Sequence, residues 1–191
     1  MDPDVVEADR GGPSPRPRHR LRYAAICGVA VLGLVGVLLA TAGPGGSTVA
    51  PFTLSRLGGG SPISYPVPGA GGNPVVINFF ASWCTPCQTE LPAFAAVAAQ
   101  EEAAGSPVRF LGIDGNDDPA SGLAMARASG VGYPVAQDYY ESVANHLGIS
   151  GLPDTVFIDR TGRLAHIIRG PVDAATFTHW IAVISSGGPP S

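Results

Sequence analysis

Lysine is absent from this chain, and charged residues of any kind are few. All eleven basic residues among the 191 are arginines, and charged residues make up 14% of the sequence. Without an ε-amino group, neither Schiff-base chemistry nor a phosphate-loop lysine is available. Residues 1–22 carry five Arg against four acids, a net charge of +1, and the remainder carries six Arg against eleven acids, a net charge of −5. An acidic domain without a basic stripe gives no support for nucleic-acid binding.

Cysteine and histidine are scarce, and their spacing argues against a zinc site. The cysteines are Cys27, Cys84 and Cys87, and the four histidines are scattered without a second cysteine pair. We therefore expect no metal and no separate cofactor. A structural disulfide normally closes a longer loop than two intervening residues, because its stabilising effect grows with loop length. The spacing of Cys84 and Cys87 instead indicates a redox-active pair.

The N-terminal segment is the only long apolar run. Residues 21–42 have no charge after Arg22 and are long enough for one membrane-spanning helix. The arginines before this run predict a cytoplasmic tail, residues 1–20, and a single-pass protein of the cell membrane whose domain is extracytoplasmic. The run ends in Ala-Thr-Ala at 40–42, so it also fits a signal peptide, and the domain would then be secreted after cleavage. Gly- and Pro-containing residues 43–50 follow as a linker.

Residues 51–188 show the alternation of strand and helix patterns typical of an α/β domain. Pro74 precedes an apolar strand at 75–80, whose uninterrupted pattern indicates burial on both faces. Asp118 and Pro119 read as a helix cap and first helical residue. Other elements are expected as strands at 52–56, 62–67, 108–113, 154–159 and 163–169, helices at 88–104 and from Asp173, and a strand-and-helix passage at 133–147.

The cysteine pair lies where a buried strand gives way to a helix, in the sequence Trp83-Cys84-Thr85-Pro86-Cys87. Unpaired N–H groups and the dipole at a helix N-terminus favour negative charge, so they stabilise a Cys84 thiolate. Cys84 is therefore expected to attack. Cys87, three residues on and less exposed, is expected to resolve the mixed disulfide. Thr85 and Pro86 support this turn.

Two segments resemble the TlpA-like branch of the thioredoxin-fold proteins. They are Ala50-Pro51-Phe52-Thr53-Leu54 and the run from Asn78 to Pro92 that contains the cysteines. The resemblance covers about residues 50–185. It implies a central mixed β-sheet flanked by helices, here preceded by one transmembrane helix, and a membrane-tethered, extracytoplasmic oxidoreductase of the kind that serves bacterial cytochrome c maturation.

The resemblance also implies roles for residues around the cysteines. Glu90 matches a glutamate that tunes the thiols and is placed to shuttle a proton, whereas Asn78 stands where thioredoxin has a buried aspartate and cannot act as that base. Pro153 resembles the cis-proline that faces the cysteines in this fold. With Trp83, we assign Leu152, Pro153 and Asp154 to substrate binding, because the backbone at Leu152 can pair with an extended segment.

The leading expectation is a reductant of disulfides in exported cysteine-containing proteins. The resemblance points to apocytochrome c as a client and to a membrane thiol-disulfide protein as the electron donor. The carboxylates of Glu90 and Asp154 would oppose the Cys84 thiolate and so favour the disulfide form. Two alternatives remain open: an oxidant that introduces disulfides into secreted proteins, and a non-catalytic client-binding module. A peroxidase is disfavoured, because Ala81 stands where such enzymes have Thr or Ser.

Overall fold

The structure is a computed structural model that describes residues 46–66 and 71–187. The predicted tail and the predicted span at 21–42 lie outside these ranges. Within them, no helix is long and apolar enough to cross a membrane.

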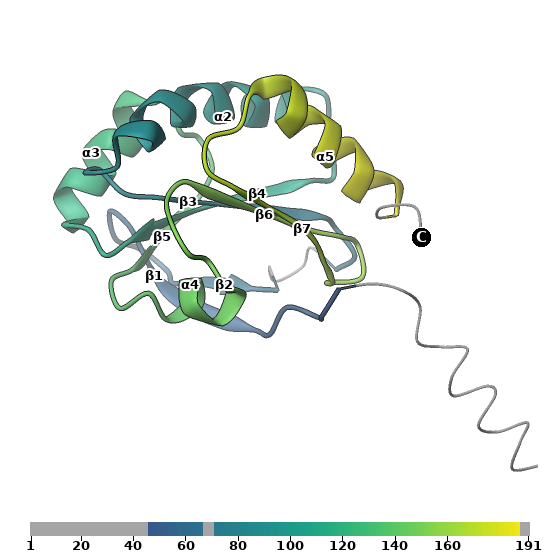
Figure 1. Ribbon diagram of the computed structural model, residues 1–191, viewed down its shortest axis with the longest axis horizontal. Helices are drawn as coiled ribbons and strands as arrows, with labels where there is room; N and C mark the ends of the chain where they lie inside the picture. The colour runs from purple at the N-terminus through teal and green to yellow at the C-terminus, as the bar shows by residue number, and fades with distance from the viewer. Residues whose placement is uncertain (1–45, 67–70, 188–191) are drawn as a thin grey trace, which may run out of the picture. The chain divides into compact units, whose positions relative to one another are not determined.

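Seven strands form one mixed sheet in the order β2-β1-β5-β4-β3-β6-β7 (Figure 1). β3 is parallel to β4, and β4 is parallel to β5, whereas β6 and β1 run antiparallel to their neighbours in the sheet. The central mixed β-sheet implied by the resemblance is therefore present. The strands are β1 (Phe52–Arg56), β2 (Ile63–Tyr65), β3 (Val75–Phe80), β4 (Arg109–Gly115), β5 (Val135–Asp138), β6 (Asp154–Ile158) and β7 (Leu164–Arg169).

Helices cover both faces of this sheet. Three lie on one face, α2 (Thr85–Ala103), α3 (Pro119–Ala128) and α5 (Ala174–Ser186), and α4 (Ser142–Leu147) lies on the other with the β1–β2 hairpin (Figure 1). β3 is buried along its whole length, as its apolar pattern predicts. Its Ile77 and Phe79 join the core on the α4 side, and Val76 and Phe80 join the cores under the other helices. A central strand with helices on both sides explains the uninterrupted apolar run.

Most expected elements are present with small shifts at their ends. α2 begins at Thr85 rather than 88, because Cys84 caps it and Pro86 occupies its first turn. Asp118 caps α3 as predicted, and Asp173 caps α5; each accepts a hydrogen bond from the backbone N–H three residues on. Phe177, Ile181 and Ile184 are the buried residues of α5 and form its apolar face toward the sheet.

The end of the segment predicted as a linker, residues 46–50, instead packs on the domain. Val49 is buried and its N–H donates to the Gly162 carbonyl at 3.0 Å. The Leu164 N–H donates to the Ser47 carbonyl at 3.0 Å, next to a bridge between Thr48 and Arg163. The domain therefore begins several residues before Pro51, because this segment supplies both an apolar side chain and backbone partners for the β6–β7 turn.

Candidate active site

Cys84 and Cys87 form a disulfide at the N-terminus of α2, directly after the central strand. Their Cα atoms are 5.2 Å apart. Cys84 is the N-cap residue, and its Sγ accepts a hydrogen bond from the Cys87 backbone N–H at 3.2 Å. The structure thus places Cys84 where the helix terminus favours negative charge on sulfur. Both residues are buried in this disulfide form, with Cys84 4% and Cys87 1% exposed, so Cys84 is less exposed than expected.

The segment that precedes the cysteines is fixed by the loop after β4. The Ser82 N–H and Oγ both donate to the carboxylate of Asp117, the latter at 2.8 Å. The Trp83 indole donates to the Asn116 carbonyl at 3.1 Å, which leaves the ring exposed beside the disulfide. Thr85 and Pro86, between the two cysteines, are exposed. These hydrogen bonds hold the turn that presents Cys84.

Glu90 is buried between α2, β3 and the segment before α5 rather than lying on the surface of α2. One carboxylate oxygen accepts from the Asn78 amide at 2.9 Å, and the other accepts from the Val172 N–H at 2.8 Å. Burial raises the pKa of Glu90; the two hydrogen bonds oppose that shift, and the charge of Asp154 adds to it. A buried carboxyl with a raised pKa, on the same helix face as Cys87, is suited to exchange a proton with the resolving thiol.

Asn78 has a role that the sequence alone did not reveal. Its amide donates to Glu90 and also to the Thr155 hydroxyl at 3.1 Å, so it links β3, α2 and β6. A neutral amide at this place cannot act as a base, but it orients the carboxylate that can. The strand pattern hid this contact, because one polar residue inside an apolar strand shows no partner in the sequence.

The loop before β6 brings Pro153 to the cysteines. The Leu152–Pro153 bond is cis, as predicted. Because Asp154 pairs with Phe79 in the antiparallel register, Pro153 lies opposite the end of β3, from which the cysteine turn departs. Leu152 packs against the apolar cluster that contains both cysteines. The three expected elements of the site, the pair, the proline loop and Glu90, are therefore assembled around one sheet end.

The Asp154 side chain is buried and forms contacts within the protein, whereas it was expected to contact substrate. It is 2% exposed and forms an ion pair with Arg169 at 3.2 Å. Its other oxygen accepts from the Gly170 N–H at 3.2 Å. A buried carboxylate is retained when it is paired and hydrogen-bonded, and here the pair fixes the proline loop to β7. The Arg169 charge also offsets the negative charge of Asp154 near the sulfurs.

Asp114, at the end of β4, is an acid that lies inside the protein. It is fully buried, and neither carboxylate oxygen has a hydrogen-bond partner. Burial first, then the negative charge of Asp117, raises its pKa to about 8. Gly122 of α3 leaves room for the carboxylate, because a β-carbon there would collide with it. Asp118 nearby is the predicted helix cap and is exposed, whereas Asp114 and Asp117 are buried.

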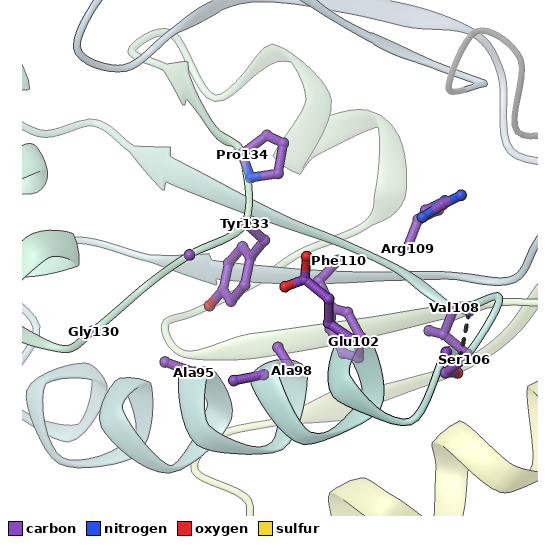
Figure 2. Close-up of a pocket in the computed structure, with 13 residues that line it drawn as sticks. Ala95, Ala98, Glu102, Ser106, Val108, Arg109, Phe110, Gly130, Tyr133 and Pro134 are labelled. Carbon is purple, nitrogen blue, oxygen red and sulfur yellow. Dashed lines mark hydrogen bonds between the residues drawn. The ribbon is translucent and has the colours of Figure 1, made fainter.

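A separate hollow of about 490 Å³ lies along the C-terminal half of α2. Figure 2 shows Ala95, Ala98 and Glu102 on its helical side, with Tyr133 and Arg109 across from them. Neither cysteine lines it. Over the ranges that the structure describes, no cluster of three or more His, Cys, Asp or Glu side chains is placed to hold a metal ion.

A cysteine pair at a helix N-terminus, opposite a cis-proline in a thioredoxin-like sheet, defines a thiol-disulfide oxidoreductase. The model of the AhpC/TSA family matches residues 46–167, and the chain belongs to that family.

Comparisons with individual proteins agree with this class. The thiol-disulfide oxidoreductase ResA of Geobacillus thermodenitrificans is 30% identical over 125 residues, covering 65% of this chain and 69% of that protein. The thiol:disulfide interchange protein DsbE homolog of Paracoccus denitrificans is 31% identical over 105 residues, or 54% of this chain and 55% of that protein. A thioredoxin family thiol:disulfide interchange protein from Chlorobium tepidum TLS, a crystal structure, has a TM-score of 0.65 at 26% identity, covering 75% of this chain and 99% of that one. The predicted relationship to thioredoxin-like thiol-disulfide oxidoreductases is confirmed by these relatives.

Proposed function

We propose that the protein reduces disulfides in exported cysteine-containing proteins through Cys84 and Cys87. The observation that carries the direction of electron flow is Glu90, a buried carboxylate three residues after Cys87 on α2 that is held by two donors. When ionised, it opposes a thiolate at the helix terminus and so favours the disulfide form. Since Arg169 offsets Asp154, Glu90 is the main source of this effect.

The reaction is two successive exchanges in which sulfur atoms and electrons balance. The Cys84 thiolate attacks one sulfur of the client disulfide, the client S–S bond breaks, and the other client sulfur leaves as a thiolate. Cys87 then loses its proton, for which Glu90 is the acceptor, and attacks the Cys84 sulfur. The second client sulfur leaves as a thiolate, the client has gained two electrons, and the protein holds the disulfide seen in the structure.

Location and partners follow from the sequence and from the resemblance. The apolar run at 21–42 anchors the chain in the cell membrane or directs its secretion, and either places the domain outside the cytoplasm. A disulfide reductant in an oxidising compartment needs a renewed supply of electrons, so a membrane thiol-disulfide donor reduces the pair. Apocytochrome c is the client that the resemblance implies; DsbE-type and HelX-type interchange proteins are among the relatives.

The redox potential of the pair tests the direction of electron flow. We expect a value near that of thioredoxin, about −270 mV, when the protein is equilibrated with glutathione buffers. An oxidant of secreted proteins would lie near about −120 mV. A potential well above about −180 mV would reject the reductant and favour the oxidant instead.

Glu90→Gln should raise the redox potential. The substitution removes the buried negative charge while keeping the side-chain shape, so the Cys84 thiolate becomes less unfavourable. An electrostatic change of about 0.7 to 1.4 kcal/mol corresponds to about 15 to 30 mV for a two-electron couple. Glu102→Gln is the matched control, because it is the same change at an exposed position of the same helix. Equal potentials for both variants would remove Glu90 from the account.

A further inference from the structure

Large exposed hydrophobic side chains gather at the sheet end that carries the disulfide. Across residues 46–66 and 71–187 they are Trp83, Tyr139 and Tyr140, which are 60%, 55% and 85% exposed. Trp83 follows β3 and the two tyrosines follow β5, and the carboxyl ends of these parallel strands lie at the same edge of the sheet. Exposed aromatic side chains grouped in this way mark an interaction surface more often than a contribution to the core.

Asn116 connects the tryptophan to the tyrosine turn. Its carbonyl accepts from the Trp83 indole at 3.1 Å, and its N–H donates to the Asp138 carbonyl at 3.3 Å, directly before Tyr139. The Tyr139 and Tyr140 rings meet edge to face with centroids 5.1 Å apart. The three rings therefore project from loops that are linked through the backbone of Asn116, by one hydrogen bond from the Trp83 side chain and one to the Asp138 backbone.

Hydrogen bonds to a buried carboxylate hold the turn that carries Tyr139 and Tyr140. The buried Asp138 carboxylate accepts from the Ser142 N–H at 2.8 Å and from two further N–H groups at the start of α4. The Glu141 N–H donates to the Asp138 carbonyl at 3.0 Å, and Glu141 adopts a left-handed backbone conformation, φ 53°. A surface held in place before binding loses little conformational entropy when a partner docks.

Charge indicates which partner this surface suits. Asp118 and Glu141 are exposed on the same loops, and residues 81–91, 114–121 and 137–145 contain no Arg, Lys or His. Carboxylates attract basic side chains, and the faces of tryptophan and tyrosine rings bind guanidinium and ammonium groups. We call Trp83, Asp118, Tyr139, Tyr140 and Glu141 the aromatic ledge.

We propose that the aromatic ledge binds a client polypeptide segment that carries arginine or lysine next to its reactive cysteine. Trp83 is adjacent to Cys84 in the chain, so a basic residue held on the ledge brings a neighbouring client sulfur to the attacking cysteine. This inference rests on the proposed function and adds to it the chemical class of the client. The preference for basic clients arises from their binding to the aromatic ledge, because the exchange chemistry at the cysteines is the same for every disulfide.

Two peptide disulfides of equal length test the ledge, one with arginine and one with glutamate beside the cysteine. The reduced full-length protein is mixed with each, and the rate of exchange is followed by quenching and separation. We expect faster exchange with the arginine peptide, and a Tyr139→Ser/Tyr140→Ser variant should lose about two- to fivefold of that preference per ring. Reduction of uncharged 2-hydroxyethyl disulfide should be unchanged. Added salt should also lower the preference.

Glu141→Gln and Glu102→Gln form a matched pair for the charge component. The first removes a ledge carboxylate and should reduce the preference for the arginine peptide, and the second should leave it unchanged. If the unaltered protein reduces both peptides at equal rates, the ledge proposal is overturned while the proposed function stands. If it reduces neither peptide nor 2-hydroxyethyl disulfide, the proposed function itself fails. A tyrosine variant that loses vesicle binding or self-association but keeps the peptide preference would also overturn the proposal.

Discussion

Replacing Cys84 with alanine is expected to reduce the rate of client disulfide reduction to that of the reaction without protein. Cys84 is the N-cap of α2, where helix N–H groups stabilise a thiolate, and Cys87 is the more deeply buried of the two sulfurs. Cys87→Ala should also abolish turnover but for a different reason. It should stop the reaction at a mixed disulfide on Cys84, because the resolving sulfur is gone.

The two variants separate catalysis from simple binding. Cys87→Ala should retain a client covalently on a non-reducing gel, and Cys84→Ala should retain none. Cys27→Ala is the matched control, since Cys27 lies in the apolar N-terminal run and should leave turnover unchanged. A Cys84→Ala protein that still acts on clients at the normal rate would show a non-catalytic binding module. The client captured by Cys87→Ala would also be open to direct identification.

Asp114 is expected to make the domain lose stability as the pH rises from about 4 to about 8. Burial, followed by the negative charge of Asp117, raises its pKa from 3.8 to about 8 in the folded protein. The folded state therefore binds a proton that the unfolded chain releases near pH 3.8. This contribution to stability is complete below the lower value and is lost as the pH rises through the higher one. One such proton changes the free energy of unfolding by at most about 1.4 kcal/mol per pH unit.

Asp114→Asn removes this dependence, because the amide is neutral at every pH in the window. Urea unfolding of the oxidised protein at pH 5, 6.5 and 8 should give a steeper loss of stability for the unaltered protein than for the variant. Asp118→Asn is the control. Asp118 is exposed, and hydrogen bonds from the Ser121 N–H and hydroxyl lower its pKa. Its ionisation therefore does not change the stability of the protein between pH 5 and 8. Parallel stability curves for the unaltered protein and Asp114→Asn between pH 5 and 8 would show that the buried acid does not retain a proton.

The site was predictable from the sequence where its chemistry is local. Cys84 and Cys87 lie within one turn, and Asp118 caps a helix three residues on, so spacing alone defines both. The Pro153 loop was predictable only through the resemblance, because its contact with the cysteines depends on the pairing of β6 with β3. A single sequence does not show which strands pair, because pairing joins residues that are distant in the chain.

The contacts that the sequence did not reveal join residues distant in the chain. Glu90 was singled out, but its partners Asn78 and Val172 come from β3 and from the segment before α5. Asp154 was expected to face substrate, and its ion pair with Arg169 across the β6–β7 ladder turns it inward. Burial of a carboxylate depends on which element covers it, and periodicity within one element does not contain that information.

Counting thiols on the folded full-length protein is the most direct test of the central claim that Cys84 and Cys87 are a reversible redox pair. The protein is equilibrated across a series of glutathione buffers, its free thiols are alkylated, and the added mass is measured. We predict that two thiols appear together over one two-electron transition and disappear when the buffer is made oxidising again. Thiols that appear only after unfolding, or that never re-form the disulfide, would contradict the account.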